Sequence, residues 1–330
     1  MHMSDALIAP VVAVTMYAAS VATGAYSINK IKLEEDKRKI PLMSVMGAFV
    51  FASQMINLTI PGTGSSGHLT GGLLLAALLG PHAAFLTMSV ILTIQSLLFA
   101  DGGILALGCN IWNMAFYSCF FGYYCIYKPI LKENFSRKKI FYASMLGSVL
   151  SLQLGAFNVT LQTLVSGITE LPFSKFVMAM QPIHLAVGLM EGLITSAILI
   201  FIYESRPELL TNENSGGKIS FRKILIILSV TTILIGGGLS LLASTNPDGL
   251  EWSIEQVAGN SDIEAEGEIY EKMSGVQETT AILPDYTLTN SENEIFGTSF
   301  SGVIGSIIVC VILAGIFKLF YRFRKVTVNK

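Results

Sequence analysis

Charged residues are scarce in this chain. Only 13% of its 330 residues are Asp, Glu, Lys or Arg, and 52% are hydrophobic, whereas soluble domains carry about 25% charged residues. Apolar runs of about 18 residues or more without charge recur along the chain, as transmembrane helices require. The sequence therefore predicts an all-α polytopic membrane protein. It also lacks a sustained basic face, which argues against nucleic-acid binding.

Cysteine is equally scarce, and no CxxC pair occurs. The four cysteines lie in apolar segments and are interpreted as small apolar side chains: Cys109, Cys119, Cys125 and Cys310. No basic region precedes the first apolar run, so a cleavable signal peptide is not expected. We expect Met1 to be retained, because a histidine at position 2 is too bulky for removal of the initiator.

A free amine followed by histidine is a specific metal-binding arrangement. The amine of Met1, the amide nitrogen of His2 and its imidazole can close two fused chelate rings, which places three nitrogens near one plane. An imidazole from His68 would complete a tetragonal set. That geometry favours Ni(II) or Cu(II) and allows Co(II), whereas zinc prefers a tetrahedron. The alternative is that Met1-His2 is an ordinary frayed terminus.

Hydropathy predicts nine passes, about seven in the first 205 residues and two after residue 221. The expected helices are 6–28, 41–60, 69–79, 83–100, 104–127, 140–164, 176–203, 224–242 and 297–320. The Lys/Arg clusters at 30–39, 128–139, 206–223 and 318–330 then all lie on one side, which the positive-inside rule makes cytoplasmic. This parity predicts that 69–79 is a pass. It places the amino terminus and loop 61–68 outside a cell membrane, and the carboxyl terminus inside.

Three further titratable residues are candidates for function. His184 and Glu191 lie on roughly one face of a predicted membrane helix, where ionisable groups are either functional or brace helices; both interpretations stay open. His82 is expected at the inner face as a helix-terminal residue. Segment 245–296 is acidic, with Lys272 as its only basic residue, and is expected to be a solvated outer loop.

Four ordered motifs give the chain a family resemblance. They are Met1-His2, Pro61-Gly-Thr-Gly-Ser-Ser-Gly-His-Leu-Thr-Gly-Gly72, the stretch from Gln95 to Met114, and His184-Leu-Ala-Val-Gly-Leu-Met-Glu-Gly192. Together they resemble the CbiM/NikM family, the metal-binding membrane component of cobalt and nickel energy-coupling factor (ECF) transporters. Residues 221–330 resemble the small CbiN/NikN companion subunit, with Asn246-Pro-Asp-Gly-Leu-Glu-Trp252 as its signature. Residues 1–205 would then be a metal-binding transmembrane domain and 206–220 a cytoplasmic linker.

The resemblance implies a substrate-binding component of an ATP-driven importer for Ni²⁺ or Co²⁺. The metal would bind to Met1, His2 and His68, and motif positions suggest Asp101, Asn110 and Asn113 as groups that orient these ligands. The implied partners are a transmembrane coupling (T) protein and ATPase (A) subunits. No GxxxxGK[ST] motif occurs, so we expect no catalytic activity and no ATP site in this chain.

Two rival functions remain open at this stage. A self-sufficient secondary transporter or channel could use His184 and Glu191 as a relay, although such proteins usually contain internal repeats and none is clear here. An integral-membrane metalloenzyme could use His68, His82 and His184, but the expected topology puts His68 and His82 on opposite sides. A planar nitrogen field with an ionised amide fits Ni(II) slightly better than Co(II). The sequence decides neither this choice nor the later use of the metal.

Overall fold

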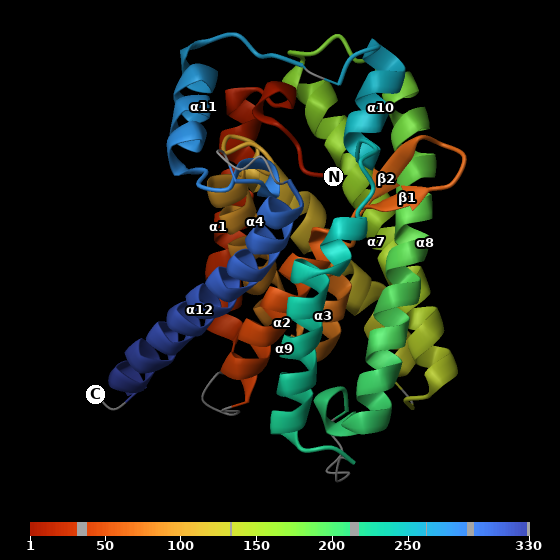
Figure 1. Cartoon of the computed structure of the whole chain (residues 1–330), viewed down its shortest axis with the longest axis vertical. Helices are drawn as coiled ribbons and strands as arrows, with labels where there is room; N and C mark the ends of the chain where they lie inside the picture. The colour runs from red at the N-terminus through yellow and green to blue at the C-terminus, as the bar shows by residue number, and fades with distance from the viewer. Residues whose placement is uncertain (32–37, 133, 212–217, 262, 289–293, 329–330) are drawn as a thin grey trace.

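The chain folds into a bundle of helices that carries a cap at one end (Figure 1). The computed structural model describes residues 1–31, 38–132, 134–211, 218–261, 263–288 and 294–328. Parts of four segments named above lie outside the described residues. They are 32–37 of the first basic cluster, 133 of the second, 212–217 of the expected linker and 329–330 of the last cluster. The amino terminus, α10 and α11 lie at one end of the bundle, here called the site end.

The helices and strands follow in this order. The elements up to the middle of the chain are η1 (Asp5–Leu7), α1 (Pro10–Lys30), α2 (Lys39–Gln54), β1 (Leu58–Ile60), β2 (Ser65–Gly67), α3 (Gly72–Leu79), α4 (Pro81–Phe99), α5 (Leu107–Asn110), the π-helical η2 (Ile111–Tyr127) and α6 (Lys128–Leu131). The remaining elements are α7 (Arg137–Ser166), α8 (Phe173–Ser205), η3 (Pro207–Leu209), α9 (Phe221–Gly237), η4 (Leu239–Leu242), α10 (Gly249–Ala258), α11 (Glu268–Thr280), η5 (Pro284–Tyr286) and α12 (Glu294–Val328).

The all-α membrane class predicted from hydropathy is confirmed. By length and composition, five helices in the described part of the chain can cross a membrane: Pro10–Lys30, Pro81–Phe99, Arg137–Ser166, Phe173–Ser205 and Phe296–Arg322. The other expected passes form shorter or interrupted helices, such as α2 and α9. The number of nine passes stays a prediction.

The short helix α3 lies in the middle of the bundle. Seven of its eight residues are buried, and it packs against α4 and η2, with further contacts to α2 and α8. Such a short apolar helix can exist at membrane depth only where neighbouring protein covers its ends. Its start differs from the expected helix 69–79, because the loop backbone remains non-helical until Gly72.

The second expected helix, 41–60, ends early, at Gln54. Residues 58–67 form a short antiparallel hairpin in which Thr59 faces Ser66. Gly62 and Gly64 have positive φ angles of 78° and 75°, a conformation that glycine adopts without a steric penalty. The hairpin leads the chain back towards the amino terminus and so presents His68 to the site.

The described residues of segment 245–296, here called the cap, form short helices, and the residues of α11 are all exposed or half-buried. The cap contains α10, α11 and η5, which lie over the site end (Figure 1). The N–H of Ser66 donates to the carbonyl of Pro247 (2.8 Å), and Asp248 closes a capping box with Glu251 at the start of α10. The hydrogen bond between Ser66 and Pro247 joins the cap to the hairpin, and the capping box fixes the start of α10.

The companion helices α9 and α12 pack on α2. Gly236 of α9 and Gly302 of α12 touch so closely that a Cβ on Gly302 would lie 2.0 Å from the Gly236 carbonyl oxygen. Small residues allow such close helix approach in membranes. The 221–330 part is therefore joined to the bundle along α2 and to its site end through the cap.

Candidate functional site: the amino terminus and His68

The first three residues run into the interior of the site end. Met3 is fully buried, and its N–H donates to Oδ1 of Asn110 (2.8 Å). Its carbonyl accepts from Nδ2 of Asn110 (3.1 Å) and from the N–H of Gly103 (2.9 Å). An amino terminus is usually frayed. These bonds instead fix the backbone that carries Met1 and His2.

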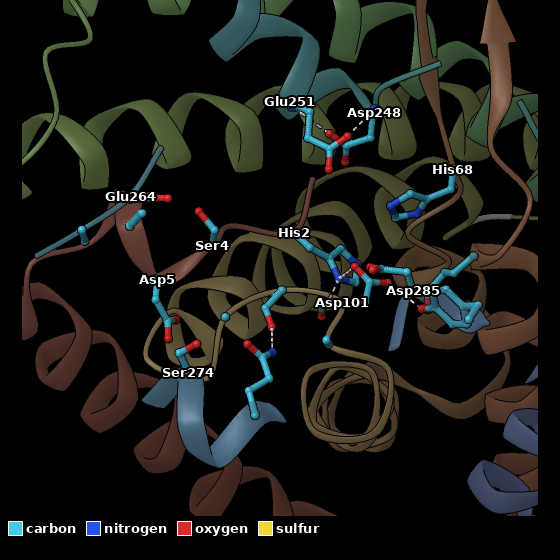
Figure 2. Close-up of a pocket in the computed structure, with 18 of the residues that line it drawn as sticks. His2, Ser4, Asp5, His68, Asp101, Asp248, Glu251, Glu264, Ser274 and Asp285 are labelled. Carbon is cyan, nitrogen blue, oxygen red and sulfur yellow. Dashed lines mark hydrogen bonds and ion pairs between the residues drawn. The ribbon is translucent and has the colours of Figure 1, made fainter. Parts of the chain in front are cut away.

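The imidazoles of His2 and His68 meet edge to face. Their ring centroids are 5.3 Å apart with an interplanar angle of 78°, and both side chains lie at the centre of Figure 2. Nδ1 of His68 donates to the carbonyl of Leu69 (2.9 Å), so its Nε2 carries the free lone pair. Burial, together with the positive terminal amine, lowers the pKa of His68 to about 4. The ring is therefore neutral at pH 7, as a metal ligand must be.

Asp101 fixes the orientation of His2. Its Oδ1 accepts from Nδ1 of His2 (2.8 Å), and the Nε2 of His2 is buried with no partner among the described residues. Burial would raise the pKa of Asp101, but the adjacent His2 outweighs it and holds that pKa well below its usual range. Asp101 is therefore in direct contact with the imidazole of His2.

The chelate predicted from the sequence requires Nδ1 of His2, which here faces Asp101. The six-membered ring can close only through Nδ1, because Nε2 is too far from the amide nitrogen along the side chain. Chelation therefore requires the imidazole to turn away from Asp101. In the orientation seen here, His2 offers the Nε2 lone pair instead.

The terminal amine of Met1 forms an ion pair with the carboxylate of Asp248. Burial would raise the pKa of Asp248, but the positive amine holds it well below its usual range. Sequence reasoning did not select Asp248, although it lies in the signature Asn246–Trp252. The missing information was tertiary, since 247 positions separate the two residues along the chain.

A cavity of about 780 Å³ opens beside these groups. His2 and His68 line it, and its wall is rich in carboxylates, several of them labelled in Figure 2. Its acidic lining residues are Asp5, Asp101, Asp248, Glu251, Glu264, Glu271 and Asp285. Clefts lined by one sign of charge concentrate counter-ions, so this cavity favours cations.

Tyr286 of the cap supports Asp101 from the other side. Its hydroxyl donates to Oδ2 of Asp101 (2.5 Å), and its ring stacks on Phe99 with centroids 4.7 Å apart. Burial and the charge of Asp101 raise the pKa of Tyr286 well above its usual value, so the hydroxyl stays a donor. Tyr286 and its neighbour Asp285 both have positive φ angles, of 57° and 50°. Residues other than glycine adopt this conformation only where the surrounding contacts enforce it.

The other candidate residues have distinct positions. Asn113 contacts Met3, with Nδ2 3.5 Å from its Sδ, donates to Gln162 (2.7 Å) and accepts from Asn158 (2.6 Å). His82 is near the start of α4, where Nδ1 lies 3.3 Å from the hydroxyl of Ser27. His184 is close to the site, because it lines a small cavity with Met1, His68 and Asp248.

Glu191 braces the loop that carries His68. Its Oε2 accepts from the N–H of Thr70 (2.9 Å), its Oε1 from the N–H of Gly71 (3.2 Å), and both oxygens lie within 2.8 Å of the Thr70 hydroxyl. These contacts occupy the carboxylate, and they favour the bracing interpretation over an ion relay.

Side chains alone do not form a metal site here. Among the described residues, no three His, Cys, Asp or Glu side chains are grouped so that they could hold a metal ion. The groups that lie closest together here are the imidazoles of His2 and His68 and the main-chain nitrogens of the amino terminus.

Comparisons with known proteins agree with these features. The model of the CbiM family, the cobalt uptake substrate-specific transmembrane region, matches residues 2–209, and that of the PDGLE domain matches residues 222–322. A NikMN protein of Archaeoglobus fulgidus is 33% identical over 94% of this chain and 95% of its own length. The fused nickel transport protein NikMN of Rhodobacter capsulatus is 29% identical over 96% of each chain.

Solved structures give the same result for the first part of the chain. The crystal structure of a truncated transition metal transporter is 32% identical, covers 62% of this chain and 99% of its own, and superposes with a TM-score of 0.55. The family match spans well over half of the chain and agrees with the resemblance in the sequence motifs. The chain therefore belongs to the CbiM family of nickel and cobalt transport proteins, with a PDGLE domain fused after the transmembrane region.

Proposed function

We propose that this chain is the substrate-binding component of an ATP-driven ECF-type importer for Ni²⁺ or Co²⁺. In this proposal the ion binds to the amine of Met1, the amide and imidazole nitrogens of His2, and the imidazole of His68. The observation that carries it is the meeting of a buried amino terminus with two imidazoles 5.3 Å apart, beside a cavity lined by carboxylates.

Binding would exchange two existing contacts for metal bonds. The amine has to leave Asp248 and lose its proton, and the His2 ring has to turn so that Nδ1 leaves Asp101. Ligands must be deprotonated to bind, so uptake of the ion releases protons. Asp248 and Asp101 remain beside the site and are able to accept hydrogen bonds from the rearranged groups, as carboxylates next to metal-bound histidines do.

The carboxylates of the cavity provide a reason for the ion to enter. Glu251, Glu264 and Glu271 line it without serving as proposed ligands. Under the positive-inside orientation, the site end faces the outside of the cell membrane, where an imported ion arrives, and the carboxyl terminus lies inside. The cap of segment 245–296 would then form part of the entrance.

Energy would come from other chains. No nucleotide-binding motif occurs in the sequence, so the proposal assigns ATP hydrolysis to A subunits and its mechanical coupling to a T protein. The 1–205 part would hold the metal, and the 221–330 part would act as a companion that covers it, with 206–220 as the linker between them.

The test is metal content and optical spectrum of the full chain, purified with its native terminus and checked by intact mass. Samples are loaded with Ni²⁺ or Co²⁺ separately, alongside His2→Ala and His68→Ala. His82→Ala is the matched control, since it removes a histidine remote from the site. We expect one yellow, diamagnetic Ni²⁺ complex per chain that His2→Ala and His68→Ala lose and His82→Ala keeps. Stoichiometric binding that survives both His2→Ala and His68→Ala would overturn the site.

Transport is tested in cells that carry the partner subunits. His2→Ala and His68→Ala should abolish uptake at unchanged membrane expression, and uptake should stop when the ATPase chains are deleted. Uptake that continues on a proton gradient without any ATPase would favour a secondary transporter instead.

A further inference from the structure

His184 is buried in α8 close to the amino terminus, but it has no part in the proposed ligand set. The residue is 2% exposed. Its Nδ1 donates to the carbonyl of Met180, one turn earlier (2.8 Å), so Nε2 carries the free lone pair of the neutral ring. No described residue donates to this Nε2, and it is not among the fully enclosed unpaired atoms of the described chain, which include Nε2 of His2. The ring therefore presents an unused acceptor that a neighbouring group can reach.

The acceptor edge of His184 faces the start of α10. A Cβ on Gly249 would lie 3.3 Å from Nε2 and 3.1 Å from Cε1 of His184, so α10 can approach the ring this closely only because Gly249 has no side chain. The preceding residue, Asp248, forms the ion pair with the amine of Met1. Packing of α10 on α8 thus brings two acceptors to one place, the carboxylate of Asp248 and Nε2 of His184.

The amino terminus shares a small cavity with both acceptors. The cavity has a volume of about 10 Å³, and Met1, His68, His184 and Asp248 all line it. A cavity of this size has room for about one water molecule at most, so the groups that line it are close neighbours. The amine of Met1 can therefore contact Nε2 of His184 directly or through one water.

This arrangement meets a geometric requirement of the amine as a metal ligand. Besides its bond to Cα, the nitrogen of a neutral amine has three directions, which hold two N–H groups and one lone pair. We propose that His184 is a positioning residue for the Met1 amine: its Nε2 accepts one N–H, while Asp248 accepts the other. The lone pair then points to the ion between His2 and His68. This inference rests on the proposed function, because it concerns the same site.

The test compares His184→Leu with His184→Gln in the full chain, by calorimetric titration with Ni²⁺ and by the optical spectrum of the complex. The glutamine oxygen can occupy nearly the position of Nε2 and remains an acceptor, whereas leucine has none. We expect His184→Leu to bind Ni²⁺ about tenfold more weakly, which corresponds to about 1.4 kcal/mol, the scale of one hydrogen bond. The yellow, diamagnetic spectrum should stay unchanged, and His184→Gln should recover most of the lost affinity.

His82→Leu is the matched control, since it is the same substitution at a histidine remote from the site, and it should bind Ni²⁺ normally. Equal Ni²⁺ affinity in His184→Leu and His184→Gln would overturn the proposal, because a histidine that only packs loses its ring in both. A changed spectrum in His184→Leu would also overturn it, by making His184 a ligand. Both results leave the binding of Ni²⁺ by the amino terminus in place, whereas an unmodified chain that forms no Ni²⁺ complex would overturn the proposed function itself.

Nitrogen NMR of the unmodified chain tests the same contact without a substitution that might disturb folding. The chain contains only four histidines, so ¹⁵N-histidine labelling gives few signals, and the one missing in His184→Gln is assigned to His184. On addition of Ni²⁺, its Nε2 signal should shift in the direction of a hydrogen-bonded acceptor. A signal that does not move while the Ni²⁺ complex forms would refute the positioning role.

Discussion

Replacing Glu191 by glutamine should weaken nickel binding, although Glu191 lies outside the proposed ligand set. The carboxylate accepts from two main-chain N–H groups, those of Thr70 (2.9 Å) and Gly71 (3.2 Å), one on each oxygen. Glutamine keeps one acceptor oxygen and replaces the other by an NH₂ group, which cannot accept. One buried N–H therefore loses its partner, and the loop that presents His68 loses an anchor.

The size of the effect follows from that single lost bond. An unsatisfied buried donor costs about 1–3 kcal/mol. The loop has to be in place for His68 to bind, so the apparent affinity falls with the population of the ordered loop. At about 1.4 kcal/mol per tenfold change, the dissociation constant for Ni²⁺ should rise about 5- to 140-fold, and the melting temperature should fall.

Calorimetric titration of the full chain with Ni²⁺ measures this change. Glu204→Gln is the matched control: it is the same substitution in the same helix, at a 39% exposed carboxylate whose partner is Arg137, and exposed pairs contribute about 0–1 kcal/mol. We expect Glu204→Gln to bind Ni²⁺ normally. Unchanged affinity and melting temperature in Glu191→Gln would refute the bracing role, and equal losses in both variants would indicate a general disturbance of α8.

Three further predictions concern the surroundings of the ligands. Gly67→Ala should lower both the melting temperature and the Ni²⁺ affinity, because the Cβ of the new alanine would lie 2.4 Å from Cγ2 of Val187. Adding Val187→Ala should restore both values. A double variant that stays as weak as Gly67→Ala would contradict the steric cause. Tyr286→Phe should weaken Ni²⁺ binding roughly tenfold in the same titration. The substitution removes the hydrogen bond from the Tyr286 hydroxyl to the charged Asp101, and such bonds contribute about 1.5–3 kcal/mol. An unchanged dissociation constant would contradict this role. The metal-free protein should be stable above pH 6.5 and lose stability as the pH falls towards 4. The pKa of His68 is ordinarily 6.5 and is lowered to about 4 in the folded state. The folded protein therefore binds this proton less readily than the unfolded chain does, so protonation favours unfolding. Thermal unfolding at pH 7.5, 6 and 5 measures this loss, and His68→Gln should reduce it.

The sequence alone determined the membrane class and the chemistry of the proposed ligands. Hydropathy and charge are local properties, so the apolar runs could be read directly, and α1, α4, α7, α8 and α12 lie close to where they were expected. The chelating capacity of Met1-His2 is likewise a property of adjacent covalent groups, and four short motifs were sufficient to indicate the family.

Only the tertiary structure decided what surrounds those ligands. The ion pair of Met1 with Asp248 and the hydrogen bond of Asp101 with Tyr286 join residues 247 and 185 positions apart, and hydropathy or residue spacing carries no information about such pairs. For the same reason, composition did not indicate that the described residues of the acidic segment 245–296 form α10, α11 and η5. The side of the His2 ring that faces Asp101 was also decided by packing, because the covalent structure allows either orientation and only the neighbouring groups select one.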